Sequence, residues 1–401
     1  MDANELETLL ISSVEDLSPY LDRWRHLAAG SPTRSPEWLL TWWEVYAEAS
    51  DCLSVLVFQG KDKRLVGLAP LYLHASAKGE RIIRFLGSGE VCTNHATWLA
   101  VSDWETRIGA EVARFIHQSS NCSHLFLEAV DEDDAAIRAT LTSLRAHGYL
   151  VHERRVQSCW KIPLPATWEE YLQTLSRSLR KKCRKLQREF FDSGRVRLHV
   201  VACEKELEEG FDILLKLHAA RWGDSRTPLG VFSSERFLNF HRLVSRKLLA
   251  QDQLRLAWLE CDGSPVAVEY QFVEPDSVYA YQAGIDLAMD RYSPGKLTMM
   301  AAIQFAIAHG CRYLDLSRGD EPYKSHWRAV PTGCYDIRVW PNSGISVRLC
   351  YLGWNLHSLV VRWGKLLLPE AFIRFGLHSL NSLRRSRDGG NSNPKGDNLG
   401  Q

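Results

Sequence analysis

Residues that could perform acid–base chemistry gather in the second half of the chain. Glu269 lies in the middle of an otherwise apolar run, VAVEYQF. Burial among such neighbours would raise the pKa of its carboxyl group, which suits a general base. Asp315, in the run YLDL, is a second candidate base, and Tyr281 could return a proton to a leaving group. An ion pair with an arginine explains Glu269 equally well, and packing in a strand explains Tyr281.

A short segment downstream could bind an anion. Ser293, Pro294 and Gly295 open a predicted helix over residues 295–309, and Lys296 follows them. Proline at a helix start leaves backbone N–H groups unpaired, and the helix dipole favours negative charge at that end. We therefore expect an anionic group, such as a phosphate, at these four residues.

A strongly basic helix is predicted upstream, over Glu169–Phe191. Thr167-x-x-Glu170 is a capping box, and apolar residues at three- and four-residue spacing indicate one buried face. Seven cations and no acid lie between Arg177 and Arg188. A solvated helix face explains such a run, but its self-repulsion favours an anionic partner. Arg180 and Arg184 are candidates to bind the phosphates of a carrier.

Residues that could bind an acceptor follow the strand of Asp315. Polar residues at a strand end often form a site. Alternatively, Asp320 caps a turn and pairs with Lys324. The candidates there are Asp320, Glu321, Tyr323 and Lys324, and Trp222, which lies far upstream of this strand, is a further candidate.

The elements that must position these residues occur in two similar series. Each half is predicted to contain two helices, three meander strands, a helix and a strand, which indicates a duplicated α+β unit. We predict two tandem lobes with mixed central sheets flanked by helices, followed by a C-terminal helical tail. The predicted boundaries are 1–160, 161–345, 346–387 for the tail and 388–401 for a disordered end.

The tail has an amphipathic pattern of leucines and basic residues. Packing against the body or a partner is the first interpretation, and peripheral contact with a membrane surface is the second. Residues 388–401 are rich in Gly, Asn and Ser, which is typical of disorder.

Composition limits the function classes. The 401 residues carry a net charge of +1, so no global field attracts nucleic acid or an anionic membrane. Ten cysteines without a C-x-x-C pair argue against a zinc site and a disulfide framework, and we expect no metal. The acidic N-terminus lacks the features of a signal peptide, and no apolar run is long enough to span a bilayer. We expect a cytoplasmic protein.

Several motifs together resemble a known family. They are SPEWLLTWWEVY with LVGLAPLYL, LSRSLRKKCRKLQRE, LHAARWGDSRTPLGVF, SPVAVEYQF, YQAGIDLAMDRYSPGK and DLSRGDEPYKSHW. They span roughly residues 15–340 and resemble the BioF2-like, FemAB-related GNAT domain of CelD/BcsL acetyltransferases of cellulose or exopolysaccharide biosynthesis. The resemblance implies two GNAT-like lobes, with acetyl-CoA or another acyl-CoA bound in the second, and no covalent intermediate. The first lobe has Thr93-Asn94-His95 where such proteins often have an acidic-aromatic pair, which argues against a role in acceptor binding.

The expected function is acyl transfer from acyl-CoA to the nitrogen or oxygen of a small or saccharide acceptor, in association with polysaccharide-synthesis machinery. A Fem-like transferase that uses aminoacyl-tRNA is one alternative, which the basic helix would suit and which salt-sensitive tRNA binding would support. A non-catalytic accessory subunit of a polysaccharide-synthesis complex is the other, because fold does not fix function.

Overall fold

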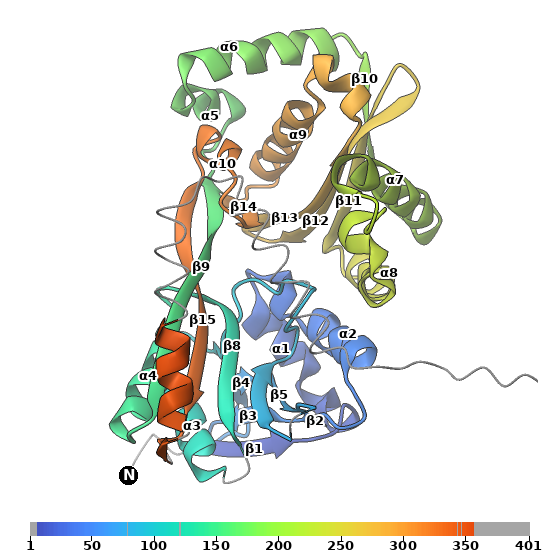
Figure 1. Cartoon of the computed structure of the whole chain (residues 1–401). Helices are drawn as coiled ribbons and strands as arrows, with labels where there is room; N and C mark the ends of the chain where they lie inside the picture. The colour runs from blue at the N-terminus through green and yellow to red at the C-terminus, as the bar shows by residue number, and fades with distance from the viewer. Residues whose placement is uncertain (1–5, 78, 120–121, 343, 346, 357–401) are drawn as a thin grey trace, which may run out of the picture.

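The computed structural model describes residues 6–356, except residues 78, 120–121, 343 and 346. Two lobes are stacked, with the first at the bottom of Figure 1 and the second at the top. A four-stranded sheet, β1-β3-β4-β7, belongs to the first lobe. A second sheet passes through both lobes in the order β10-β11-β12-β13-β14-β9-β15-β8-β6-β5-β2.

The first lobe begins with an edge strand and two helices, and the other elements follow along the chain. Helices α3 and α4 pack closely at Gly109, where an added Cβ would lie 2.2 Å from the Ala136 carbonyl oxygen. Its elements are β1 (Glu7–Ile11), α1 (Leu21–Ala28), α2 (Pro36–Tyr46), β2 (Cys52–Leu53), β3 (Val55–Gln59), β4 (Leu65–Ala69), β5 (Leu71–Ala75), β6 (Arg81–Phe85), β7 (Leu99–Ala100), α3 (Glu105–Gln118), β8 (His124–Asp131), α4 (Ala135–Ala146) and β9 (Leu150–Pro163).

The second lobe repeats the order of two helices, three meander strands, a helix and a strand, as predicted. Its elements are α5 (Trp168–Thr174), α6 (Arg177–Leu186), β10 (Val196–Val200), α7 (Glu204–Trp222), α8 (Glu235–Leu249), β11 (Leu254–Cys261), β12 (Ser264–Glu274), β13 (Ser277–Ile285), α9 (Pro294–Ala308), β14 (Tyr313–Arg318), α10 (Tyr323–His326) and β15 (Val330–Trp340).

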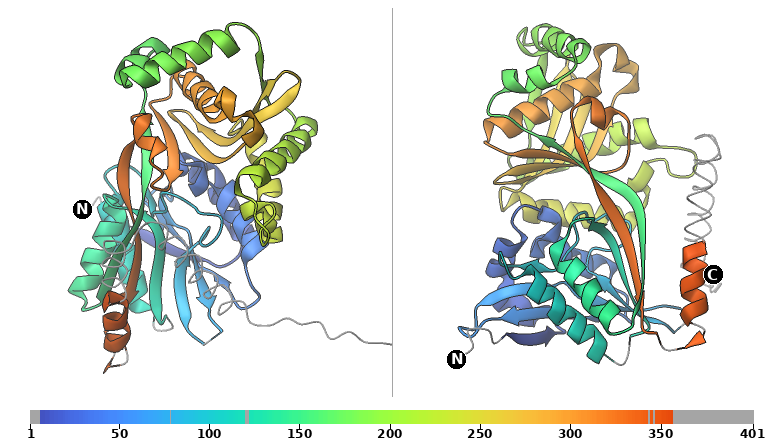
Figure 2. Two further views of the ribbon diagram at one scale, coloured as in Figure 1. Left: turned by 45° about the horizontal axis from the view of Figure 1, so that its top comes forward. Right: turned by 90° about the vertical axis from the view of Figure 1, so that its left-hand side faces the viewer.

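Two long strands join the lobes. β9 pairs with β14 of the second lobe and, between Leu150 and Lys161, with β15. β15 in turn pairs with β8 of the first lobe. Both strands run from one lobe to the other in Figures 1 and 2. The boundary predicted at residue 160 therefore falls inside β9.

Aromatic side chains fill the space between the lobes. The Trp38 ring of α2 makes edge contacts with Phe240 of α8 at 4.8 Å and with Phe272 of β12 at 5.4 Å. The Tyr281 ring of β13 lies 5.4 Å from Trp38 as well. Such pairs add to the free energy of burial because ring edges and faces carry opposite partial charges. These four aromatic side chains therefore help to hold the lobes together.

Three features differ from the predictions. The single helix predicted over residues 169–191 is broken, because Leu175 is extended and the Ser176 side chain caps a new helix, α6, by accepting from the Leu179 N–H. Strands β1 and β10 were not predicted, since each is a five-residue edge strand with mixed polarity. In the first half the predicted three-stranded meander is interrupted, because the apolar run 65–73 divides at Pro70 into β4 and β5, which belong to different sheets.

Only the start of the predicted tail is described. Residues 347–356 are helical, and the remainder of 346–387 and all of 388–401 lie outside the described residues. Among the helices that the structure describes, none combines the length and hydropathy needed to cross a bilayer.

Candidate functional site

Glu269 is a carboxylate of strand β12 that neighbours helix α9. Side chains alternate along the strand, so Val268 and Tyr270 enter the apolar core while Glu269 occupies the opposite face. The Thr298 hydroxyl of α9, which donates to the carbonyl oxygens of Pro294 and Gly295 at 3.4 and 3.3 Å, lowers the pKa of this carboxylate. The Glu269 side chain remains partly exposed. Burial raises the pKa of Glu269 to about 7, although Thr298, Arg255 and Arg221 counteract the rise. Glu269 can therefore accept a proton near neutral pH.

A buried arginine lies on the same face as Glu269. Arg255 of β11 is paired with Gln271 of β12, and its Nη1 donates to Gln271 Oε1 at 2.5 Å. The guanidinium is stacked 4.3 Å from the centre of the Phe305 ring of α9. Burial lowers the pKa of Arg255 to about 10. Its positive charge favours the ionised form of Glu269 and partly offsets the effect of desolvation.

Sequence reasoning missed Arg255, Gln271 and Thr298. A signal was available for the first two, because a charged or amide side chain interrupts the apolar strands LRLAW and VEYQF. In antiparallel strands, Glu269 and Gln271 share a face, and the register places Arg255 on it.

Tyr323 of α10 belongs to the surroundings of Glu269. It is 40% exposed, and burial together with the carboxylates of Glu321 and Glu269 raises its pKa to about 12. Arg221 lowers the pKa of both Tyr323 and Glu269, so its charge acts on both groups. The guanidinium of Arg221 lies 4.7 Å from the ring of Trp222, which is 52% exposed. Two of the predicted acceptor-binding residues, Trp222 and Tyr323, are thus exposed aromatic residues. Arg221 stacks on the first, and its charge lowers the pKa of the second and of Glu269.

Strands β13 and β14 separate beside Glu269. Their parallel pairing covers only Ser277–Tyr279 with Tyr313–Asp315. On its other edge β14 pairs with β9, from Tyr313 to Arg318, whereas β13 continues along β12 as far as Ile285. Ala283 is the β13 partner of Glu269, so the candidate base lies next to the part of β13 that has no ladder with β14. An extended ligand can add to such a strand edge through main-chain hydrogen bonds.

The predicted anion site at the start of α9 is open. Ser293 is left-handed, with φ of 57°, and its carbonyl oxygen accepts from the N–H groups of Lys296 and Leu297. Pro294 has no N–H, so the Gly295 N–H is the one left in this turn without an acceptor among the described residues. An added Cβ on Gly295 would meet no atom within 4 Å, and Lys296 is exposed beside it. One backbone donor and one ammonium group are therefore accessible here.

Arg180 and Arg184 are bound to neighbouring side chains. Arg180 donates to Gln173, and Arg184 forms an ion pair with Glu169 of α5. The helix that carries them nevertheless packs beside α9, where Gln304 Nε2 donates to Gln187 Oε1 at 2.8 Å. The two arginines contribute positive charge near α9 while they join α6 to α5.

Asp315 takes part in a buried charge cluster between the lobes. The ring of His95, from the first lobe, donates through Nε2 to Asp315 at 2.9 Å and through Nδ1 to Asp131 at 2.6 Å. Lys161 Nζ lies 3.6 Å from Asp315, which is fully buried. Burial would lower the pKa of His95, but the two carboxylates overcome it and raise the pKa to about 10. Burial also opposes ionisation of Asp315, yet His95 holds its pKa below the usual value.

Two further predicted residues stabilise local structure. The Tyr281 hydroxyl donates to the Val91 carbonyl oxygen of the first lobe at 2.5 Å, so its proton is already engaged in a hydrogen bond. Lys324 is 2% exposed, and its Nζ donates to the carbonyl oxygens of Ser317 and Gly319 and pairs with Glu321 at 3.0 Å.

Asp320 has two partners on β9. It accepts from the Ser158 N–H and from Trp160 Nε1, both at 3.2 Å. Asp320 and Lys324 therefore have separate partners. Asp320 binds β9, and Lys324 binds Glu321 and two carbonyl oxygens of the loop after β14.

Metal-binding side chains come together once among the described residues. His95, Asp131 and Cys159 place their ligand atoms within 4.8 Å of one another. Both ring nitrogens of His95 already bind carboxylates, and a doubly hydrogen-bonded imidazolium has no lone pair for a metal. As arranged, the group is an ion-pair cluster.

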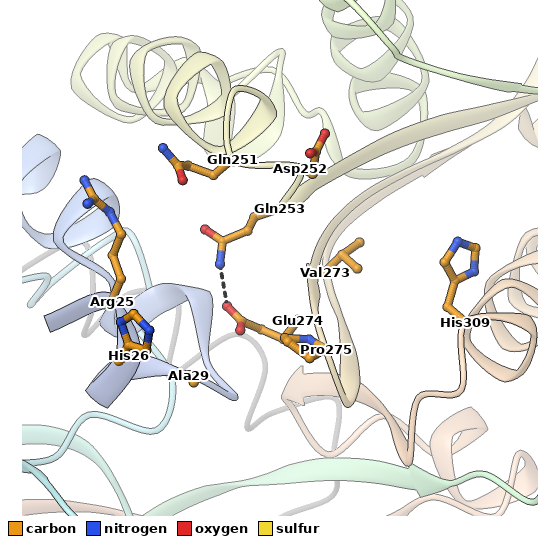
Figure 3. Close-up of a pocket in the computed structure, with 10 residues that line it drawn as sticks. All are labelled: Arg25, His26, Ala29, Gln251, Asp252, Gln253, Val273, Glu274, Pro275 and His309. Atoms are coloured by element: carbon orange, nitrogen blue, oxygen red, sulfur yellow. Dashed lines mark hydrogen bonds between the residues drawn. The ribbon is translucent and has the colours of Figure 1, made fainter. Parts of the chain in front are cut away.

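A pocket of about 480 Å³ lies far from Glu269, between helix α1 and the turn from β12 to β13. Figure 3 shows Gln253 and Glu274 at its centre, joined by a hydrogen bond of 2.9 Å. His309, which follows the C-terminal end of α9, also lines it. The opposite end of the same helix carries Gly295, so this pocket does not belong to the predicted donor site.

Comparison with known proteins identifies the fold. Residues 177–325 match the family model described as an acetyltransferase (GNAT) domain. A crystal structure of FemX aligns with a TM-score of 0.56 at 12% identity, covering 82% of this chain and 96% of FemX. A conserved protein of unknown function from Bacteroides thetaiotaomicron VPI-5482 aligns with a TM-score of 0.51 at 13% identity, covering 84% and 100%.

Among curated proteins, none matches the sequence. The Glu269 site, the strand separation and the start of α9 all fall inside the matched region. The chain thus has the two-lobed fold of the FemX structure, and residues 177–325 of its second lobe are similar to an acetyltransferase (GNAT) domain.

Proposed function

We propose that the chain is an acyltransferase that uses acetyl-CoA or another short acyl-CoA and deprotonates its acceptor with Glu269. The observation that carries the proposal is the carboxylate of Glu269, with its pKa raised to about 7, beside the separation of β13 from β14. A carboxyl group with a pKa near neutrality can both accept and release a proton.

The donor would lie along β13 towards α9. Its pyrophosphate would be bound by the Gly295 N–H and Lys296, and its extended arm would pair with the free part of β13. This arrangement brings the thioester next to Ala283, the β13 partner of Glu269.

In the proposed reaction the acceptor amine or hydroxyl loses its proton to Glu269 and attacks the thioester carbonyl carbon. The tetrahedral adduct collapses as the carbon–sulfur bond breaks, and the CoA thiolate takes a proton from solvent. Neither step needs a covalent acyl-enzyme. The partial exposure of Glu269 leaves a path for its proton to return to solvent.

Exposed aromatics favour a saccharide as acceptor. Trp222 and Tyr323 are 52% and 40% exposed, and flat aromatic faces bind the apolar faces of sugar rings. This acceptor class agrees with the resemblance to CelD/BcsL acetyltransferases and with a role in cellulose or exopolysaccharide synthesis.

Calorimetry with acetyl-CoA tests the donor site. Gly295→Asp should abolish binding because its carboxylate would repel the phosphates, whereas Gly295→Ala should bind as the parent does, since a Cβ there meets no neighbour. Absence of binding by the parent chain would refute a CoA donor.

Turnover with amino-sugar acceptors tests the base. Glu269→Gln should reduce kcat/KM by about 10² to 10⁴. In the parent, kcat/KM should rise about tenfold from pH 6 to pH 8, following a pKa of about 7. Activity that survives Glu269→Gln would remove Glu269 from the mechanism, and binding without any turnover would favour an accessory subunit.

One observation favours an aminoacyl-tRNA donor as the second candidate. Arg177, Lys181 and Arg188 of the basic segment are exposed on the surface opposite its buried face. Such a stripe can neutralise successive phosphates of a nucleic acid. Salt-sensitive tRNA binding, without binding of acetyl-CoA, would support this candidate.

A further inference from the structure

The helix over residues 347–356 has apolar residues on two opposite faces. One face packs on the long strands: the Tyr351 ring lies 6.2 Å from Trp340 of β15, and the Trp354 ring lies 6.4 Å from His152 of β9. The guanidinium of Arg338 stacks on Trp354 at 4.2 Å. Figure 2 shows this helix, in orange-red, at the side of the molecule.

The opposite face, which we call the leucine face, points away from the body. It consists of Ile345, Leu349, Leu352 and Leu356, which are 77%, 62%, 58% and 63% exposed. Spacings of four, three and four residues place them in one row along the helix. A row of four large exposed aliphatic side chains is uncommon on a protein without a partner at that surface.

The segment that carries the leucine face has charged residues of one sign. Residues 343–369 contain no Asp or Glu, and they contain Arg348, Arg362 and Lys365. In the sequence the apolar spacing continues beyond the described helix at Leu359, Trp363 and Leu366. A basic, acid-free segment with a row of leucines and a tryptophan is typical of helices that lie in the surface of an anionic membrane.

We propose that the leucine face binds the surface of a bilayer that contains anionic lipid, with the helix parallel to the membrane plane. The leucine side chains enter the boundary of the acyl chains, and Arg348 contacts lipid phosphates. The packing of Tyr351 and Trp354 on β15 and β9 fixes the helix to the catalytic body. The acyltransferase would therefore be held at the membrane surface.

A second copy of the chain is a poorer partner for this face. Paired helices select one another through opposite charges beside their apolar rows. Here both copies would present only cations, with Arg348 at the edge of the row in each. Lipid phosphates supply the opposite charge that a second copy lacks.

Vesicle sedimentation of the full chain tests the proposal. The probes are vesicles of phosphatidylcholine alone and of phosphatidylcholine with about one third phosphatidylglycerol, a fraction that gives a strongly negative surface. We expect binding to the anionic vesicles that weakens as salt is raised. A variant with Leu349→Glu, Leu352→Glu and Leu356→Glu should bind at least about tenfold more weakly, because apolar contact is replaced by repulsion.

The matched control carries Leu10→Glu and Leu198→Glu, at leucines that are 51% and 45% exposed elsewhere on the surface. It should bind vesicles as the parent does, and circular dichroism should show that all variants are folded. Failure of the parent to bind anionic vesicles, or equal binding by the leucine-face variant and the control, would overturn the proposal. A change from dimer to monomer in that variant, with vesicle binding unaltered, would assign the face to a second copy.

Discussion

Raising the pH should weaken the junction between the lobes, because the charge of His95 is lost. His95 is 2% exposed and is bound on both ring nitrogens by Asp131 and Asp315. Its pKa is about 10 in the folded chain against 6.5 in the unfolded chain. A raised pKa means that the folded state binds the proton more tightly, so the stabilisation is complete below pH 6.5 and disappears as the pH passes 10.

The magnitude follows from the two pKa values. A shift from 6.5 to about 10 corresponds to roughly 5 kcal/mol in all. Between pH 6.5 and pH 9 the contribution of His95 to the free energy of unfolding should decrease by about 3 kcal/mol.

The assay is urea unfolding followed by tryptophan fluorescence at several pH values, for the parent and for His95→Asn. Asparagine is the appropriate replacement because residue 95 has φ of 57°, a conformation that asparagine adopts readily. The variant should be less stable than the parent at pH 6.5 by about 3–5 kcal/mol, since two buried carboxylates lose their cation.

By pH 9 the difference in the free energy of unfolding between the parent and His95→Asn should have decreased by about 3 kcal/mol. Groups that titrate elsewhere affect both proteins equally and cancel in the comparison. Stability curves that stay parallel from pH 6.5 to pH 9 would refute a charged His95 at this junction.

Three further substitutions test the assignments around the site. Thr298→Val removes a hydroxyl that lowers the pKa of Glu269, so the acidic limb of kcat/KM should move up by about half to one pH unit. An unmoved limb would contradict this influence of Thr298. Tyr281→Phe should change kcat by less than about threefold and lower the free energy of unfolding by about 1 kcal/mol, because the hydroxyl donates to Val91. A hundredfold or greater decrease in kcat would instead indicate that Tyr281 is the catalytic acid. Lys324→Met leaves two carbonyl oxygens without this donor and should lower the free energy of unfolding by about 2–3 kcal/mol in thermal or urea unfolding. Unchanged stability together with a raised KM for the acceptor would indicate that Lys324 binds the acceptor.

The sequence contained enough to locate Glu269 and the start of α9. A carboxylate inside an apolar strand stands out from its neighbours, and proline with glycine marks a helix start. The order of helices and strands could also be predicted, because local periodicity is set by the side chains of each element. Arg255 could have been found from the same pattern once the register of β11 and β12 was known.

The role of Asp315 could not be predicted, because its partner His95 lies 220 residues away in the sequence. Local patterns report the polarity of a position and not which distant side chain meets it. Lys324 is a similar case: its ammonium group binds main-chain carbonyl oxygens, which no sequence pattern distinguishes. The break at Leu175 and Ser176 was missed since leucine and serine both occur inside helices, and only the cap reveals the interruption.

The interleaving of β9 and β15 has a consequence for anyone who would study either half in isolation. A fragment cut at residue 160 divides β9, and a fragment that starts there keeps β15 but loses β8, against which β15 is paired. Each piece would expose an unpaired strand edge, which invites aggregation. The two halves should consequently melt in one cooperative step, and a hinge that swings them apart is not available for admitting substrates.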